Sequence, residues 1–246
     1  MQGMCHPDGE SGAARATTDL ETVSKENVLK FFQLYVYSDK NLTTQLVRRA
    51  EKAGYKALVV TIDLPAIGIR YNDHRNKFTL PSHLRMANFD EIEFPEEVTK
   101  SKGGFLEYLA SYFSSSLTWE DIEWLKSITT LPIVLKGILT AEDAIKGLEM
   151  EALPEIVDAV GHACEIYVDG GVRTGADIFK ALALGANMVF VGRPMVWGLT
   201  CGGYDGAYKV LQILEHELKN TMCLSGCPTV KSITRDRVVR KMFSKL

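Results

Sequence analysis

Two glycine-rich turns, each with an arginine, are the residues of this chain whose types and spacing point most directly to chemistry. Segment 169–175 reads DGGVRTG and segment 191–194 reads VGRP, and each follows an apolar run. Glycine lets backbone N–H groups approach an anion closely, and a guanidinium adds charged donors that suit phosphate. One such turn alone is usually a tight connection with a surface arginine, but two in succession predict a phosphate site. Its donors would come from Gly170, Gly171, Arg173, Gly192 and Arg193.

Lys136 ends a further apolar run, 132–137 (PIVLKG), so its ammonium would project from the end of a strand. A lysine in that place fits three roles. It can form a Schiff base, offset the charge of a cofactor, or pair with a carboxylate at the rim of the fold. The residues themselves leave all three open.

Gln33 and Tyr35 alternate along the run 31–37 (FFQLYVY), so both side chains are expected on the same side of a strand. That side is the inner one if Phe32 and Leu34 face helices. Polar groups inside a barrel cost free energy unless a polar partner meets them, so this pair also indicates a ligand. Two more polar residues follow in the next run and the loop beyond it: Thr61 and Arg70.

The elements that must position these residues are short apolar runs separated by amphipathic segments. The runs are 31–37, 57–63, 132–137, 165–171 and 187–194. Runs that are apolar almost throughout are typical of strands covered on both faces, and their alternation with helical segments predicts parallel βα units. The expected fold class is α/β, a TIM (β/α)8-type barrel or a doubly wound sheet. Because only five strands are recognisable where a barrel needs eight, the barrel is expected to be incomplete.

Helix boundaries support this division. Gly54 and Gly185 each close a helix just before a strand, and Gly226 closes a final amphipathic helix that starts near Ala207. Thr118 and Thr140 are each followed by acidic residues, as expected for N-caps.

The alternation breaks between the runs 132–137 and 165–171. Two helical segments, 140–150 and 155–161, stand there in series where a strand belongs. A single helix kinked at Pro154 is the alternative, and the two remain open.

Composition excludes several classes of function. The 246-residue chain has a formal net charge of −3, which offers no basic surface for nucleic acid, and no apolar run approaches the length of a membrane span. The five cysteines lack metal-type spacing and indicate reduced thiols of an intracellular protein, so no metal site is expected. We expect an irregular segment over 1–27, the barrel over 28–243, and a tail of Ser244, Lys245 and Leu246. Ser-Lys-Leu at a C-terminus is a peroxisomal address read by an import receptor.

The chain resembles a known family over about residues 31–233. The matching segments are FFQLYVYSDKN, GYKALVVTIDLP, LTWEDIEWLKSITTLPIVLKGILTAEDA and VDGGVRTGADIFKALALGANMVFVGRPMVWGL. They resemble the FMN-dependent 2-hydroxy-acid oxidases, in particular the peroxisomal hydroxyacid oxidases that include glycolate oxidase. The resemblance implies oxidation of an (S)-2-hydroxy acid to a 2-oxo acid, with O2 reduced to hydrogen peroxide. The family forms homo-oligomers, and the sequence leaves the oligomeric state of this chain open.

The resemblance also implies roles for individual residues. The isoalloxazine of FMN would contact Gln33, Thr61 and Lys136. The ribityl phosphate would lie against Asp169, Gly170, Gly171, Val172, Arg173, Gly192 and Arg193. The substrate would meet Tyr35 and Arg70.

The chain departs from the family at the catalytic base. The family carries a histidine and a substrate-binding arginine in a Ser-Asn-His-Gly-x-Arg-Gln-Leu-Asp run on its sixth strand, and that run is absent between Lys136 and Asp169. Elements equivalent to the first and second strands are also not recognisable. His74 shares the loop of Arg70 but matches no catalytic residue, and the other histidines lie away from strand ends. We therefore expect an FMN-dependent oxidase with impaired activity, or, as the alternative, a non-catalytic FMN- or phosphate-binding barrel fragment.

Overall fold

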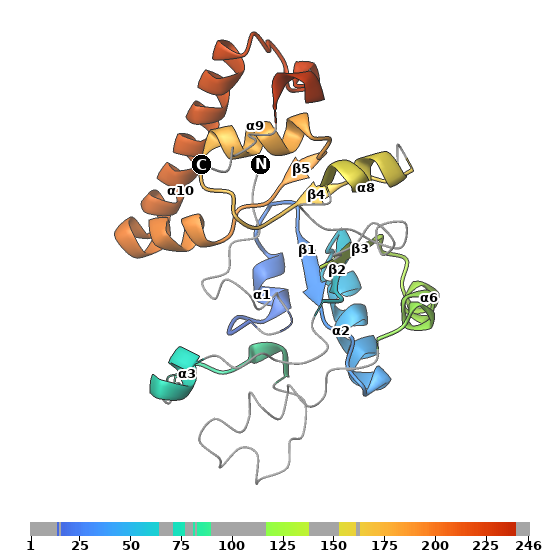
Figure 1. The fold of residues 1–246 in the computed structure, drawn as a ribbon. Coiled ribbons are helices and arrows are strands. Elements are labelled where there is room, and N and C mark those ends of the chain that lie inside the picture. The colour runs from blue at the N-terminus through green and yellow to red at the C-terminus, as the bar shows by residue number, and fades with distance from the viewer. Residues whose placement is uncertain are drawn as a thin grey trace. The chain divides into compact units, whose positions relative to one another are not determined.

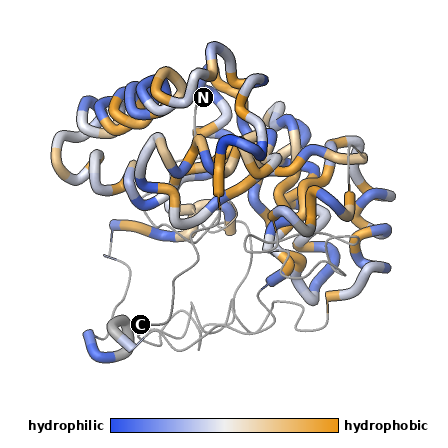
Figure 2. The backbone as a smooth tube through the Cα atoms, turned by 45° about the horizontal axis from the view of Figure 1, so that its top comes forward, coloured by the Kyte–Doolittle hydropathy of each residue, from blue (hydrophilic) through white to orange (hydrophobic). Residues whose placement is uncertain are grey.

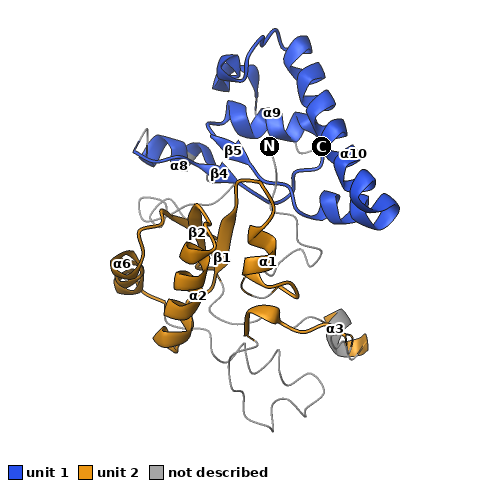
Figure 3. Ribbon diagram, turned by 180° about the vertical axis from the view of Figure 1, so that it is seen from behind, with its two compact units in different colours: residues 1–9, 138–246 blue, residues 10–137 orange. Residues whose placement is uncertain are grey.

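The computed structural model describes residues 14, 16–63, 71–76, 81, 83–89, 117–137, 153–160 and 163–239. The chain divides into two compact units, one formed by residues 10–137 and the other by residues 138–246 together with 1–9 (Figure 3). Both units draw on the segment 28–243 that the sequence predicts as a barrel domain. Each is described here by itself.

The unit of residues 10–137 is built on a three-stranded parallel sheet. Its strands are β1 (Phe31–Leu34), β2 (Ala57–Thr61) and β3 (Ile133–Lys136), in that order across the sheet (Figure 1). Helix α2 (Lys40–Lys52) connects β1 to β2, and α6 (Trp119–Ile128) precedes β3. All three strands lie within the predicted apolar runs, although each is shorter than its run. The predicted βα alternation is confirmed for this unit.

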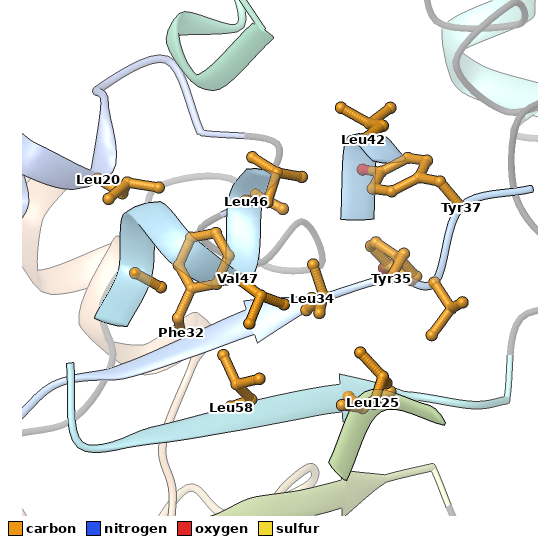
Figure 4. Close-up of a cluster of buried hydrophobic side chains, with 14 of the residues drawn as sticks. Leu20, Phe32, Leu34, Tyr35, Tyr37, Leu42, Leu46, Val47, Leu58 and Leu125 are labelled. Carbon is orange, nitrogen blue, oxygen red and sulfur yellow. The ribbon is translucent and has the colours of Figure 1, made fainter. Parts of the chain in front are cut away.

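The core of this unit lies on one face of the sheet. Phe32 and Leu34 point from β1 toward Leu46 and Val47 of α2, and Leu58 of β2 lies beside them (Figure 4). Successive strand residues alternate between faces, so this face contains the even-numbered residues of β1 and β2. Full burial of a leucine such as Leu58 contributes about 2 kcal/mol to the free energy of unfolding. The tube in Figure 2 shows that hydrophobic and hydrophilic residues alternate along the helical coils.

The helices of this unit begin and end at the residues that the sequence indicates. Gly54 adopts φ +81° just after α2, and Thr118 forms a capping box with Asp121 at the start of α6. The expectation of an irregular segment over residues 1–27 is wrong for α1 (Leu20–Ser24). This short helix forms because the Asp19 carboxylate accepts the Thr22 N–H at 2.7 Å while Leu20 is fully buried in the core.

A polar cluster attaches α1 to the rest of the unit. Arg49 of α2 donates two hydrogen bonds to the Glu21 carboxylate, at 2.8 and 2.9 Å, and a third to the backbone oxygen of Asn88. The buried Asn88 side chain accepts the Leu20 N–H at 2.8 Å. Asn88 belongs to the short helix η2 (Ala87–Phe89), and helix α3 (Tyr71–Asn76) precedes it in the chain.

The unit of residues 138–246 contains a two-stranded parallel sheet of β4 (Tyr167–Val168) and β5 (Met188–Val189). Helix α9 (Gly175–Ala183) connects them and packs on α10 (Arg193–Leu224). Helix α8 (Leu153–Val160) precedes β4, and the short helices η3 (Val230–Ser232) and η4 (Arg235–Arg237) follow α10. The prediction that a strand extends over 187–194 is wrong at its end, because Gly192 caps a helix that begins at Arg193.

Helix α10 consists of two arms joined at a kink. Gly202 and Gly203 leave helical geometry, and Gly203 has φ +58° and ψ −141°. The arms meet at Gly198 and Gly206, where a Cβ on Gly206 would lie 2.0 Å from the Gly198 backbone oxygen. The predicted final helix is the second arm, and its end at Gly226, with φ +65°, is confirmed.

Five strands are present in the described residues, as the sequence predicts, and they form two separate parallel sheets. The α/β, incomplete-barrel prediction is therefore confirmed at the level of strand number and direction. Pro154 lies in the first turn of α8, where proline is tolerated. The predicted segment 140–150 and its cap Thr140 lie outside the described residues, as does the tail 244–246. None of the described helices has both the length and the apolar composition that crossing a bilayer requires.

Candidate functional site

Three of the predicted site residues lie on one face of the three-stranded sheet, opposite the α2 side. Gln33 is in register with Val59, and Thr61, two residues further along β2, is in register with Lys136. In-register neighbours share a face, so Gln33, Thr61 and Lys136 form a polar row near the carboxyl ends of the strands. Gln33 Nε2 donates a hydrogen bond to Thr61 Oγ1 at 2.7 Å. The structure thus brings these three predicted residues together.

The polar row contains a buried acceptor that has no hydrogen-bond partner. Gln33 is only 5% exposed, and its Oε1 atom is buried without a donor among the described residues. An unsatisfied buried polar atom costs about 1–3 kcal/mol. Because Nε2 donates to Thr61, the orientation of the amide is fixed, and Oε1 can accept a hydrogen bond from an N–H or O–H group of a ligand. This observation fits a cofactor ring that carries an N–H group.

The turn after β3 is held against the segment after β2. Gly137 has φ +92°, and a Cβ placed on it would lie 2.2 Å from Cγ of Asp63. Only glycine suits both the positive φ and this close approach. The Ile62 N–H also donates to the Lys136 carbonyl at 2.9 Å, which extends the ladder to the end of the polar row. Lys136 is half-buried at this edge.

Tyr35 lies differently from the strand-based expectation. β1 ends at Leu34, so strand alternation does not fix the direction of Tyr35, and its ring is buried in the same cluster as Phe32 and Leu34 (Figure 4). Its predicted contact with substrate stays a prediction. Arg70 and the side chain of His74 lie outside the described residues.

The predicted phosphate loops belong to the other unit and leave the same edge of its sheet. Val168 is in register with Val189, and the Phe190 N–H donates to the Val168 carbonyl at 2.7 Å. Because the strands are parallel, loop 169–174 and loop 190–193 emerge side by side. The two turns that the sequence pairs by pattern are therefore neighbours in space.

The glycines of these loops leave backbone open. Gly170 and Gly171 have φ +85° and +67°, and no atom lies within 4 Å of a Cβ built on either or on Gly192. All three are exposed, as are Asp169, Arg173 and Arg193. Val172 is different, because its side chain is buried against α9 and α10. It fixes the loop to the core, and only its backbone is available to a ligand.

The two helix N-termini at this edge differ in their first-turn donors. At α9 the Asp177 carboxylate accepts the Arg173 and Thr174 N–H groups, and the Glu217 carboxylate accepts the Gly175 N–H at 2.8 Å. Desolvation raises the pKa of Asp177, but hydrogen bonds from Thr174, Lys180 and the backbone outweigh it and hold the pKa below its usual value. At α10 no side chain caps the start, and the described residues supply no acceptor for the Gly192 and Arg193 N–H groups.

Sequence reasoning missed the acidic residues at the start of α9. Asp177 had a readable signal, because Thr174 and Asp177 have the spacing of a capping box, and that box is present. Glu217 had none, because it is 42 positions from the N–H group that it accepts. The described histidines, His83 and His216, are exposed. No group of three or more His, Cys, Asp or Glu side chains in the described ranges is arranged to hold a metal ion.

Parallel βα units with a polar row at one set of strand ends, and glycine–arginine loops at another, define a class of protein. They are typical of α/β-barrel enzymes that hold a phosphate-bearing cofactor at the carboxyl ends of the strands. The family model described as FMN-dependent dehydrogenase matches residues 1–152 and 148–240. The chain belongs to this family of FMN-dependent oxidoreductases.

Individual relatives agree with this assignment. The chain is 42% identical over 275 residues to glycolate oxidase 3 of Arabidopsis thaliana, covering 97% of this chain and 75% of the relative. It is 43% identical over 282 residues to 2-hydroxyacid oxidase 1 of Homo sapiens, with 98% and 76% covered. A crystal structure of mandelate oxidase with (S)-4-hydroxymandelic acid is 38% identical with a TM-score of 0.79, covering 90% of this chain and 68% of that one.

The comparisons also locate a discontinuity. The family model matches in two segments that meet at residues 148–152, within the interval where the sequence lacks a strand. The alignment with the Arabidopsis relative runs over 275 positions while using 97% of a 246-residue chain. That relative therefore carries additional residues inside the aligned range.

Proposed function

We propose that this chain binds FMN and acts on (S)-2-hydroxy acids, and that its turnover is impaired. The observation that carries the FMN proposal is the buried Gln33 Oε1 atom. It has no donor among the residues that the structure describes, and it lies in a row with Thr61 and Lys136. Bound FMN would supply two-electron redox chemistry: a 2-hydroxy acid loses its α-hydrogen with the electron pair and its hydroxyl proton to become a 2-oxo acid, and O2 takes up two electrons and two protons to become hydrogen peroxide.

Each part of the site has a proposed task toward FMN. Gln33 Oε1 accepts an N–H of the isoalloxazine, and Thr61 holds the amide in that orientation through its contact with Nε2. The Lys136 ammonium offsets the negative charge of the reduced ring. The phosphate takes backbone donors and guanidinium groups from the loop residues Asp169, Gly170, Gly171, Val172, Arg173, Gly192 and Arg193. Tyr35 and Arg70 contact the substrate.

Impaired turnover is proposed because the chain lacks the family's base. Residues 137–168 contain no arginine, and His162 is the single histidine there. Removing a hydroxyl proton near neutral pH requires a base within hydrogen-bond reach, and its loss costs about 10²–10⁴-fold in rate. The break in the family match at 148–152 supports the absence of that segment.

FMN binding is tested by titrating the purified chain with FMN and following flavin fluorescence. Replacing Gln33 with leucine removes one buried hydrogen-bond pair, so we expect Kd to rise about 10-fold. Gln45→Leu is the matched control, because Gln45 is exposed on α2. A wild-type chain that binds no FMN, or equal Kd values for both variants, contradicts the proposed ring contact.

Turnover is tested separately with glycolate, lactate and longer 2-hydroxy acids, measuring hydrogen peroxide. We expect bound flavin with little peroxide. Robust turnover would overturn the impairment. Anaerobic addition of substrate distinguishes the alternative, a non-catalytic FMN-binding fragment: slow bleaching of the flavin absorbance indicates a weak oxidase, and none indicates a binder alone.

We further propose that the chain is imported into peroxisomes through Ser244, Lys245 and Leu246, and that it self-associates as its family does. A fluorescent protein fused before residue 1 should colocalise with a peroxisomal marker and become diffuse when the last three residues are removed. Light scattering of the purified chain tests self-association, and a monomer contradicts it.

A further inference from the structure

The start of α9 is bound by a carboxylate from another helix. Glu217 lies on the second arm of α10, and its Oε2 atom accepts the Gly175 N–H at 2.8 Å. Gly175 is the first residue of α9 and follows loop 169–174 directly. The hydrogen bond therefore fixes the end of the phosphate loop to α10.

The contact at Gly175 is also unusually close. A Cβ on this residue would lie 2.1 Å from the Leu218 backbone nitrogen and 2.5 Å from the Glu217 carbonyl carbon. The backbones of α9 and α10 therefore touch at this point, with Ile178 and Leu218 buried around it. Any change that moves Glu217 shifts the loop with it.

Helix α10 positions both of the loops proposed to bind the phosphate. Its first arm starts at Arg193 after the N-cap Gly192, and no described side chain caps this start, while its second arm carries Glu217. One helix therefore sets the position of both phosphate loops. The spacing of the two arms depends on the close approach of Gly198 and Gly206 at the kink.

Glu217 also changes where an anion can bind. A helix N-terminus attracts negative charge, but two carboxylates, Asp177 and Glu217, already occupy the start of α9. The start of α10 and the open backbone of Gly170 and Gly171 remain for a phosphate.

We propose that Glu217 is a positioning residue for the cofactor phosphate. By accepting the Gly175 N–H it holds loop 169–174 beside the start of α10 and closes the α9 N-terminus to the phosphate. This inference rests on the proposed binding of FMN. It concerns the phosphate end alone, so its signature is the preference for FMN over riboflavin, which has the same ring and lacks the phosphate.

The test compares two conservative variants by titration with FMN and with riboflavin. Glu217→Asp keeps the charge but shortens the side chain by one methylene, so the carboxylate no longer reaches Gly175. We expect Kd for FMN to rise about 10-fold, with Kd for riboflavin unchanged. Glu217→Gln keeps the chain length and an acceptor oxygen, so its preference for FMN should stay within about 2-fold of wild type. Glu215→Asp is the matched control, because Glu215 is an exposed neighbour that pairs with Lys219.

The outcomes separate this inference from the proposed function. A wild-type chain that binds neither flavin refutes the proposed function itself. If wild type prefers FMN and Glu217→Asp keeps that preference, or binds FMN more tightly, Glu217 does not position the phosphate. Equal losses of FMN and riboflavin assign Glu217 a purely structural role. A loss of preference in Glu217→Gln as large as in Glu217→Asp contradicts the hydrogen-bond mechanism.

Discussion

The two sheets present their site residues in opposite ways. In the unit of residues 10–137 the polar row is built from side chains, and Gln33 and Thr61 are at least 92% buried. In the unit of residues 138–246 the candidate phosphate loops are exposed and present mainly backbone, with open space around Gly170, Gly171 and Gly192. A flat apolar ring requires a dry, shaped surface, whereas a phosphate requires N–H donors and positive charge. The contrast separates a buried side-chain row, suited to a ring, from an exposed backbone site, suited to an anion.

The first way to sharpen this comparison is to weaken the core of each sheet. Leu58 of β2 is fully buried, and Leu58→Ala should lower the free energy of unfolding by about 3 kcal/mol through lost contacts and a cavity. Met188 of β5 is half-buried, so Met188→Ala should cost less than half as much. Urea unfolding followed by circular dichroism measures both. Equal losses would show that the two sheets are buried to the same depth.

The second test compares two glycines that are needed for different reasons. Gly175→Ala places a Cβ against the backbone of α10 and should lower the free energy of unfolding by about 2 kcal/mol. The variant should also lose the preference for FMN over riboflavin. Gly54→Ala meets no atom within 4 Å but must adopt φ +81°, so we expect about 1 kcal/mol and unchanged flavin binding. Thermal unfolding and flavin titration measure both effects. A larger loss of unfolding free energy in Gly54→Ala than in Gly175→Ala would mean that α9 and α10 can move apart to accommodate the added Cβ.

The third test uses the ion pair that attaches α1. Hydrogen bonds from Arg49 hold the pKa of Glu21 below its usual value, so the pair stabilises the fold above about pH 4.5 and this contribution is lost as the pH falls through the lowered pKa. Both side chains are partly exposed, so Glu21→Gln should cost about 0.5 kcal/mol at pH 7. Urea midpoints of wild type and variant should converge in acid. A difference in urea midpoint that persists at pH 3 would show that the Arg49–Glu21 ion pair is not its cause.

The smallest expected effect is in alkaline solution. The hydrogen bond to Glu165 raises the pKa of Tyr167 to about 12, and burial raises the pKa of Tyr55 to about 12. A raised tyrosine pKa contributes stability below pH 10 that is lost as the pH approaches 12. Glu165→Gln should return the pKa of Tyr167 toward 10 in an absorbance titration at 295 nm and leave the pKa of Tyr55 unchanged. If both tyrosines still titrate at high pH in this variant, Glu165 does not cause the raised pKa of Tyr167.

Much of the fold could be predicted from local pattern. The five apolar runs, the glycines at 54, 185 and 226, and the cap at Thr118 each depend on a few neighbouring residues, and the structure confirms them. The errors have two different origins. α1 depends on contacts with distant residues, which periodicity cannot show, because Leu20 is buried and its N–H donates to the Asn88 side chain. The start of α10 at Arg193 has a local signal, because Pro194 lies in the first turn, where proline is favoured.

The candidate site divides in the same way. The sequence by itself determined the candidate residues, including the two glycine–arginine turns, and the absence of the histidine–arginine run, because these follow from residue type and short-range order. Only the tertiary structure decided that Gln33 Oε1 has no donor within the described part of the chain, that Tyr35 packs with the core, and that Glu217 accepts the Gly175 N–H. These features depend on which groups three-dimensional packing brings within hydrogen-bonding distance, and a one-dimensional pattern does not encode that distance.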